Sequence, residues 1–106
     1  MNPPIAKAFV AVSEMAYRLG ARKINQLPGC WEKQIDERWW VALNPHREPI
    51  KCSHGVEVQP FDCYVEYNGF PAGSFNAAGG FLAAGEAANE QSFIEACDNM
   101  AREVEA

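Results

Sequence analysis

Residues 61–75 read FDCYVEYNGFPAGSF, in which two β-prone runs flank the dipeptide Asn68-Gly69. A two-residue type I′ turn needs a positive φ at both central positions, which asparagine tolerates and glycine adopts without strain. The stretch therefore predicts a β-hairpin. Pro71 cannot donate a ladder hydrogen bond, so the return strand is expected at a sheet edge or next to a bulge.

Alternation along the first strand of this hairpin divides its side chains between two faces, because successive residues of a strand point in opposite directions. The more apolar set is the better candidate for the core and comprises Cys63, Val65 and Tyr67. Tyr64 and Glu66 then point to the opposite face.

Two more short strands are expected upstream, at residues 31–35 and 39–43, joined by the turn 36–38. Trp39 shares one face of the second strand with Val41 and Leu43, so Trp40 must point to the other face. Residues 44–60 contain three prolines and a glycine, which predicts a looped excursion with weak strands near 50–52 and 56–58.

Both ends of the chain have helical periodicity. An apolar stripe with three- and four-residue spacing predicts a first helix over residues 3–19. A second stripe includes Phe93 and Cys97 and predicts a C-terminal helix that begins at Asn89 or at Ser92, since either residue can cap a helix.

These elements predict a single α+β domain over residues 1–106. We expect an antiparallel meander sheet of four to six short strands, flanked by the N-terminal and C-terminal helices. Packing both helices on one face of the sheet is the simplest way to bury three one-sided apolar surfaces.

The charge of the chain is −5 and is unevenly distributed. Residues 1–51 hold eight bases and five acids, a net +3, whereas residues 52–106 hold one base and nine acids, a net −8. Long-range repulsion from phosphate makes direct nucleic-acid binding unfavourable, and the acidic half favours a partner with a basic surface.

The sequence also suggests where the protein works. The N-terminus lacks a secretory signal pattern and no apolar run is long enough for a membrane span, so we expect a cytoplasmic protein that does not bind membranes. In such a reducing compartment the four widely spaced cysteines are expected to be free thiols.

One group of residues suggests metal or thiol chemistry: His46, Cys52, His54 and Cys63. Thiolate and imidazole suit zinc, but paired C-x-x-C or H-x-x-x-H spacings are missing. Cys52 beside His54 also resembles an activated nucleophile, although the sequence identifies no third group to orient the histidine. A small metal-binding or thiol enzyme is therefore kept as an alternative, and no cofactor is expected.

Twelve aromatic residues are many for a chain this short, and a sheet covered on one face leaves some of them on the open face. Aromatic side chains anchor protein interfaces, and the acidic helix would steer a basic partner. The expected partner-binding residues are Trp40, Tyr64, Glu66, Phe70, Glu90, Glu95 and Asp98. In the alternative interpretation, Trp40 packs under residues 44–60 and Phe70 packs under the hairpin.

We therefore expect a small acidic protein-binding module rather than an enzyme. A sharper version is a phage or mobile-element accessory protein that inhibits a host protein, with acidic side chains that imitate the phosphates of DNA. A structural subunit that assembles with copies of itself is a further alternative.

Overall fold

The structure is a computed structural model that describes residues 3–19, 23–75 and 87–105, with side chains described for 10–19, 23–74 and 91–103. Two α-helices, one short 3-10 helix and six strands follow one another in these residues. Their order is α1 (Pro3–Arg18), η1 (Ile24–Gln26), β1 (Trp31–Gln34), β2 (Trp39–Leu43), β3 (Ile50–Lys51), β4 (Glu57–Val58), β5 (Cys63–Tyr67), β6 (Phe70–Phe75) and α2 (Ala87–Glu105).

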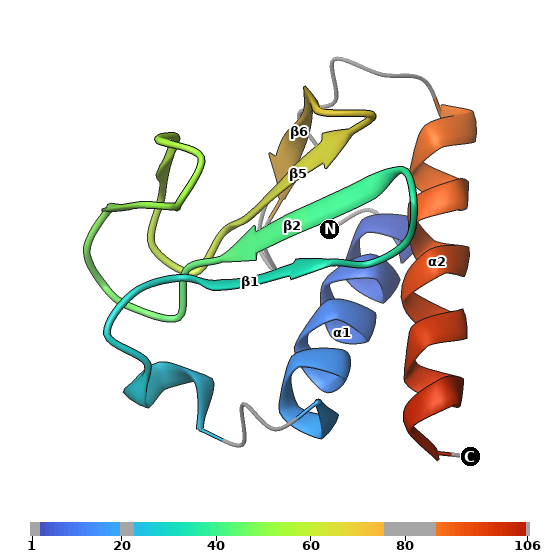
Figure 1. The fold of residues 1–106 in the computed structure, drawn as a ribbon, viewed down its shortest axis with the longest axis horizontal. Coiled ribbons are helices and arrows are strands. Elements are labelled where there is room, and N and C mark those ends of the chain that lie inside the picture. Colours follow the sequence, from blue (N-terminus) through green and yellow to red (C-terminus); the bar gives the residue numbers. More distant parts are fainter. Residues whose placement is uncertain (1–2, 20–22, 76–86, 106) are drawn as a thin grey trace.

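Four strands form one antiparallel sheet in the order β1-β2-β5-β6 (Figure 1). The hairpin between β5 and β6 turns at Asn68 and Gly69, whose φ angles are 52° and 82°, so the predicted turn is confirmed. Pro71 lies on β6, an edge strand, and a register shift between Val65 and Glu66 marks an irregularity next to it. The prediction for this proline is also confirmed.

The turn between β1 and β2 is held by Asp36. Its Oδ1 accepts hydrogen bonds from the backbone N–H groups of Arg38 and Trp39, both at 2.8 Å. A short polar side chain that satisfies nearby backbone donors stabilises a turn locally. The tight turn keeps β1 and β2 in register from Trp31 opposite Leu43 to Gln34 opposite Trp40.

Both helices cover the same face of this sheet, as predicted. Side chains from α1 and α2 join those of Trp39, Val41, Cys63 and Val65 in one buried core. The alternation predicted for β2 and β5 is thus confirmed, since these residues share the helical side. Neither helix, within the residues that the structure describes, has the length and apolarity needed to cross a bilayer.

The start of the second helix differs from the prediction. It begins at Ala87, not at Asn89 or Ser92. Ser92 lies inside the helix, and its Oγ accepts a hydrogen bond from the indole Nε1–H of Trp39 at 3.1 Å. The serine therefore ties α2 to the sheet instead of capping the helix.

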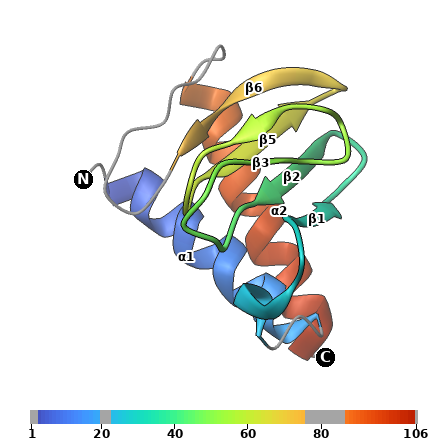
Figure 2. The same ribbon diagram turned by 90° about the vertical axis from the view of Figure 1, so that its left-hand side faces the viewer.

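Residues 50–58 form a small two-stranded unit, β3 paired with β4, which we call the flap. Figure 1 shows the flap (green) and α2 on opposite sides of the sheet, and Figure 2 views the flap from the front, with β3 ahead of β2 and β5. The two weak strands expected within residues 44–60 are therefore present, and they cover much of the face that was expected to be open.

Candidate functional site

The flap buries the second face of the sheet around Trp40. Trp40, Ala42 and Tyr64 from the sheet pack against Cys52 and Val58 from the flap, and all five side chains are buried. The expectation that Trp40 and Tyr64 are exposed is therefore wrong. The alternative, in which Trp40 packs under residues 44–60, is confirmed, because the apolar side chains of the flap remove this face from water.

Glu66 lies beside this cluster and is itself buried. Its Oε2 accepts a hydrogen bond from the hydroxyl of Tyr64 at 2.8 Å, and its Oε1 lies 2.9 Å from Nδ1 of His54. A carboxylate accepts hydrogen bonds, and the imidazole tautomer with its proton on Nδ1 would donate to it here. Both carboxylate oxygens are satisfied, as a buried charge requires.

His54 reaches the site from the turn of the flap. Its ring stacks on Trp40 with the ring centroids 3.7 Å apart and the planes inclined by 14°. The histidine side chain is 42% exposed, whereas that of Glu66 is only 10% exposed. His54 therefore covers the carboxylate and the tryptophan from the solvent side.

The hydroxyl of Tyr64 is held as a permanent donor. Burial, followed by the hydrogen bond to Glu66 and the charge of that carboxylate, raises the pKa of Tyr64 well above its ordinary value. Tyr64 also meets Trp40 edge to face, with ring centroids 6.2 Å apart. The arrangement of Trp40, Tyr64 and Glu66 is thus fixed by the sheet and by mutual contacts.

Separate contacts anchor the flap. At its turn, the backbone N–H of Ser53 donates to Oε2 of Glu32 at 3.0 Å, and the hydroxyl of Ser53 donates to Oε1. At its base, the fully buried Asn44 donates from Nδ2 to the carbonyl oxygens of Glu48 (2.7 Å) and Val58 (2.9 Å). These two anchors hold the flap at both ends, and neither involves the side chain of His54.

Part of the second face beyond the flap is uncovered. A pocket of about 290 Å³ lies between β4 and β6, with Val58, Tyr64, Pro71 and Gly73 among its lining residues. Glu57 and Asp62 also line it and make its rim acidic. The flap therefore leaves the β6 side of this face open.

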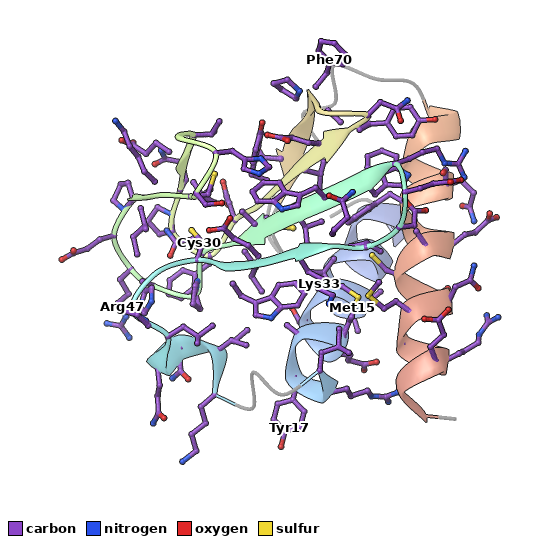
Figure 3. All side chains as sticks on the ribbon, in the orientation of Figure 1. Met15, Tyr17, Cys30, Lys33, Arg47 and Phe70 are labelled. Carbon is purple, nitrogen blue, oxygen red and sulfur yellow. The ribbon has the colours of Figure 1, made fainter. Side chains whose placement is uncertain are left out.

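The remaining predicted partner-binding residues do not join this site. Phe70 is 73% exposed at the tip of the β5–β6 hairpin, so the alternative that it packs under the hairpin is wrong (Figure 3). Glu95 is exposed and Asp98 half-buried on α2, on the other side of the sheet, and the side chain of Glu90 lies outside the described residues. The structure thus separates residues that the sequence grouped by chemistry.

The four candidate metal or thiol residues are also dispersed. Cys63 lies in the core beneath the helices, whereas Cys52 belongs to the flap and packs against the opposite face of the sheet. Nε2 of His46 is 2.6 Å from the carbonyl oxygen of Leu27, and His54 faces Glu66. In the described part of the chain, no three His, Cys, Asp or Glu side chains are arranged to hold a metal ion.

Three of the four thiols lie in environments that disfavour the thiolate form. Burial raises the pKa of Cys63 and of Cys97 well above the ordinary value, with neighbouring groups adding to the effect. Burial, with smaller contributions from Cys52 and Glu32, raises the pKa of Cys30 from 9.0 to about 11. Reactive cysteines have lowered pKa values, so the environments of these three thiols are the opposite of activating.

Cys30, the most accessible of the four cysteines, should react slowly with iodoacetamide at pH 8. Its thiolate fraction is about a hundredfold lower than that of a thiol with an ordinary pKa, and the greater nucleophilicity of a more basic thiolate recovers about tenfold. We therefore expect alkylation of Cys30 to be about tenfold slower in the folded protein than in urea. Mass spectrometry measures the rate, and the Cys30→Ser variant assigns the signal to this site. Equal rates in the two states would contradict the assignment.

A different surface was not identified from the sequence. Residues 59–62 form a tight turn in which the backbone N–H of Asp62 donates to the carbonyl of Gln59 at 3.0 Å. Pro60 occupies the second position of this turn and Phe61 the third, with a φ of 61°. A turn with a positive φ at its third position favours glycine or asparagine there, so an aromatic residue is unusual.

Phe61 stands at the rim of an apolar pocket of about 220 Å³, which Ser13 of α1 and Pro45 also line. Val10 and Tyr17 share the helix face of Ser13, because residues three and four apart are neighbours on a helix. Val10 is 51% exposed, Tyr17 60% and Phe61 49%. We call Val10, Ser13, Tyr17, Phe61 and this pocket the α1–Phe61 surface.

Comparison with protein-family models, with curated proteins and with solved structures finds no match to this chain, so the two surfaces described above are interpreted from their own geometry.

Proposed function

We propose that this chain is a non-enzymatic protein-binding module that holds its partner on the α1–Phe61 surface. The observation that carries the proposal is the backbone of Phe61, which adopts a positive φ while its ring stands half-exposed at an apolar pocket. Neither property stabilises the folded chain by itself. Both are expected of a side chain that is retained for contact with another molecule.

The energies support this interpretation. A non-glycine residue in the left-handed region costs about 1 kcal/mol, and a ring that is half in water recovers only about half of the 1.5–3 kcal/mol available from full burial. The net gain to the fold from Phe61 is therefore close to zero. The same ring would become fully buried if a partner covered the pocket, and buried aromatic side chains dominate interface energies.

The partner we propose is a protein that inserts an apolar side chain into the pocket between α1 and Phe61. The exposed side chains of Val10 and Tyr17 extend the contact along the helix. Isolated exposed apolar residues are normal on any surface, but here several lie together. Phe70 is at the opposite end of the molecule from Tyr17 in Figure 3 and would lie outside this contact. A role for Phe70 stays a prediction.

DNA mimicry is a less favoured version of the proposal. A mimic must present its carboxylates to a basic groove, but Glu66 is buried and bonded to Tyr64 and His54. Glu57, by contrast, is exposed. A partner complex that dissociates completely at high salt would favour this version, because screening weakens charge pairs far more than apolar contacts.

The proposal is tested by photo-crosslinking in the native host. A benzophenone amino acid replaces Phe61 in one variant, Phe70 in a second and the exposed Lys51 in a third, which serves as a background control. We expect a discrete crosslinked protein from position 61 that is lost when Tyr17 is also changed to serine. A crosslink from position 70 alone would contradict the proposed surface, and a crosslink to a second copy would identify the partner as the chain itself.

A companion variant separates binding from folding. Phe61→Gly relieves the positive φ but removes the ring, so its free energy of unfolding should stay within about 1 kcal/mol of the unmodified protein. This variant, used as bait in a pull-down, should no longer retain the protein that was identified by crosslinking from position 61. If Phe61→Gly instead lost several kcal/mol in urea unfolding, the ring would be a structural element and the proposal would fail.

A further inference from the structure

The surroundings of His54 form a site that does not depend on His54. Trp40 of β2 and Glu66 of β5 are directly paired in the sheet register, so their side chains emerge side by side on one face. Tyr64 shares that face two residues earlier and fixes one carboxylate oxygen of Glu66. We call Trp40, Tyr64 and Glu66 the Trp40–Glu66 site.

This site recognises a specific chemical shape. The occupant is a flat group that stacks on an indole face at 3.7 Å and directs an N–H in its own plane at a buried carboxylate 2.9 Å away. In the free chain the imidazole of His54 meets both conditions. Its side chain is nevertheless 42% exposed, so it is accessible to exchange with solvent.

We infer that the Trp40–Glu66 site is a binding site for the guanidinium group of an arginine from a partner protein, and that His54 occupies it in the free chain. Guanidinium is planar, always charged and carries its N–H donors in its own plane. It therefore reproduces both contacts of the imidazole and adds a full positive charge over the tryptophan and beside the carboxylate.

Other ligand classes fit less well. A lysine ammonium is a compact charge without a flat face, so it pairs with Glu66 but cannot stack on Trp40. An uncharged aromatic ring stacks but leaves one oxygen of Glu66 without a donor in a buried place, which is costly. The Trp40–Glu66 site thus favours arginine because only a flat, charged group can both stack on Trp40 and pair with Glu66.

Exchange needs only a small movement. The flap is held at its turn by Ser53 with Glu32 and at its base by Asn44, and none of these bonds involves the ring of His54. The imidazole can therefore rotate into solvent while the flap stays closed. Its competition lowers the apparent affinity for arginine, because a site that is mostly filled is available for only a fraction of the time.

This inference concerns a surface other than the α1–Phe61 surface and stands or falls separately from the proposed function. It also supplies a specific form of the basic partner that the acidic half of the chain favours. The arginine would come from a flexible or protruding segment of the partner, since the Glu66 side chain that it must reach is only 10% exposed.

The test uses small probes of defined chemistry. The amides of N-acetylarginine, N-acetylcitrulline and N-acetyllysine are titrated into the unmodified protein and into His54→Ala, with binding followed by NMR chemical shifts. Because alanine vacates the Trp40–Glu66 site, we expect the arginine probe to bind His54→Ala about tenfold more tightly than the unmodified protein. Citrulline, which keeps the shape but lacks the charge, should bind at least about tenfold more weakly than arginine.

The matched control is His54→Ala with Glu66→Gln, in which the carboxylate alone is changed. Its affinity for the arginine probe should fall about tenfold relative to His54→Ala. Equal binding of arginine and citrulline, or equal binding by the two variants, would overturn the inference, as would the absence of saturable binding to His54→Ala.

If His54→Ala does not fold, the same probes are titrated into the unmodified protein and the ring signals of His54 are followed. Excess arginine probe should then shift the ring signals of His54 towards those of an exposed histidine, and the lysine probe should not. Unchanged His54 signals at saturating probe would equally overturn the inference.

Discussion

Replacing Trp39 by alanine should lower the free energy of unfolding by about 4 kcal/mol, as truncation of a large core aromatic does. Trp39 is fully buried and joins three elements. Its ring centroid lies 4.6 Å from that of Tyr67 and 5.2 Å from that of Phe93, and its Nε1–H donates to Ser92 on α2. A small domain has only about 5–15 kcal/mol of stability, so the variant would lose a large fraction of it.

Urea unfolding at pH 7 measures this effect, and two further variants divide it into parts. Trp39→Phe keeps an aromatic ring but removes the donor, and Ser92→Ala removes only the acceptor, for which we expect a loss of about 1 kcal/mol. A loss below about 1.5 kcal/mol for Trp39→Ala would show that helix and sheet are not joined through this residue.

Asn44 should be the second most sensitive position. Its Nδ2 donates to the carbonyl oxygens of Glu48 and Val58, and its Oδ1 accepts from the backbone N–H of His46 at 2.9 Å. Asn44→Ala leaves these three groups without a partner in or near the core, and we expect a loss of about 3 kcal/mol. Asn44→Asp should be worse, because a carboxylate would face two carbonyl oxygens without a donor.

Asn99→Ala is the matched control, since Asn99 is exposed on α2 and its removal should change stability by less than about 0.5 kcal/mol. Hydrogen exchange locates the loss within the chain. The N–H of Cys52, which donates to the carbonyl of Val56 in the flap, should exchange faster in Asn44→Ala than in the unmodified protein. Equal exchange at this amide would mean that Asn44 does not anchor the flap.

Local patterns were sufficient to predict the architecture. The Asn68-Gly69 turn, the alternation along β5 and the helical stripes each depend on residues close together in sequence, and each was confirmed. The predicted start of α2 was wrong because Ser92, a residue type that often caps helices, instead contacts Trp39, which is far away in the sequence. A local rule has no access to such a tertiary contact.

The candidate site was only partly predictable. Alternation placed Trp40, Tyr64 and Glu66 on one face, and the structure agrees. Whether that face is open depended on where the flap folds, and its proline-rich sequence contains no signal for that. The same ambiguity hid the pairing of His54 with Glu66.

Phe61 escaped notice for a different reason. A proline followed by glycine or asparagine predicts a turn with a positive φ at its third position, but Pro60 is followed by an aromatic residue. The conflict between residue and backbone becomes visible only once φ is known. Sequence rules are expected to fail at such strained positions.

The insertion point of the flap has a consequence for how this protein can diversify. Leu43 and Cys63 are register partners, so the chain departs from the sheet and rejoins it at adjacent positions. Loops closed in this way grow at little cost, about 0.6 kcal/mol for each doubling in length. Descendants of this chain can therefore lengthen or shorten the excursion while the helices and the four-stranded platform are inherited, provided that the new segment still covers Trp40 and Tyr64 and still partners Asn44.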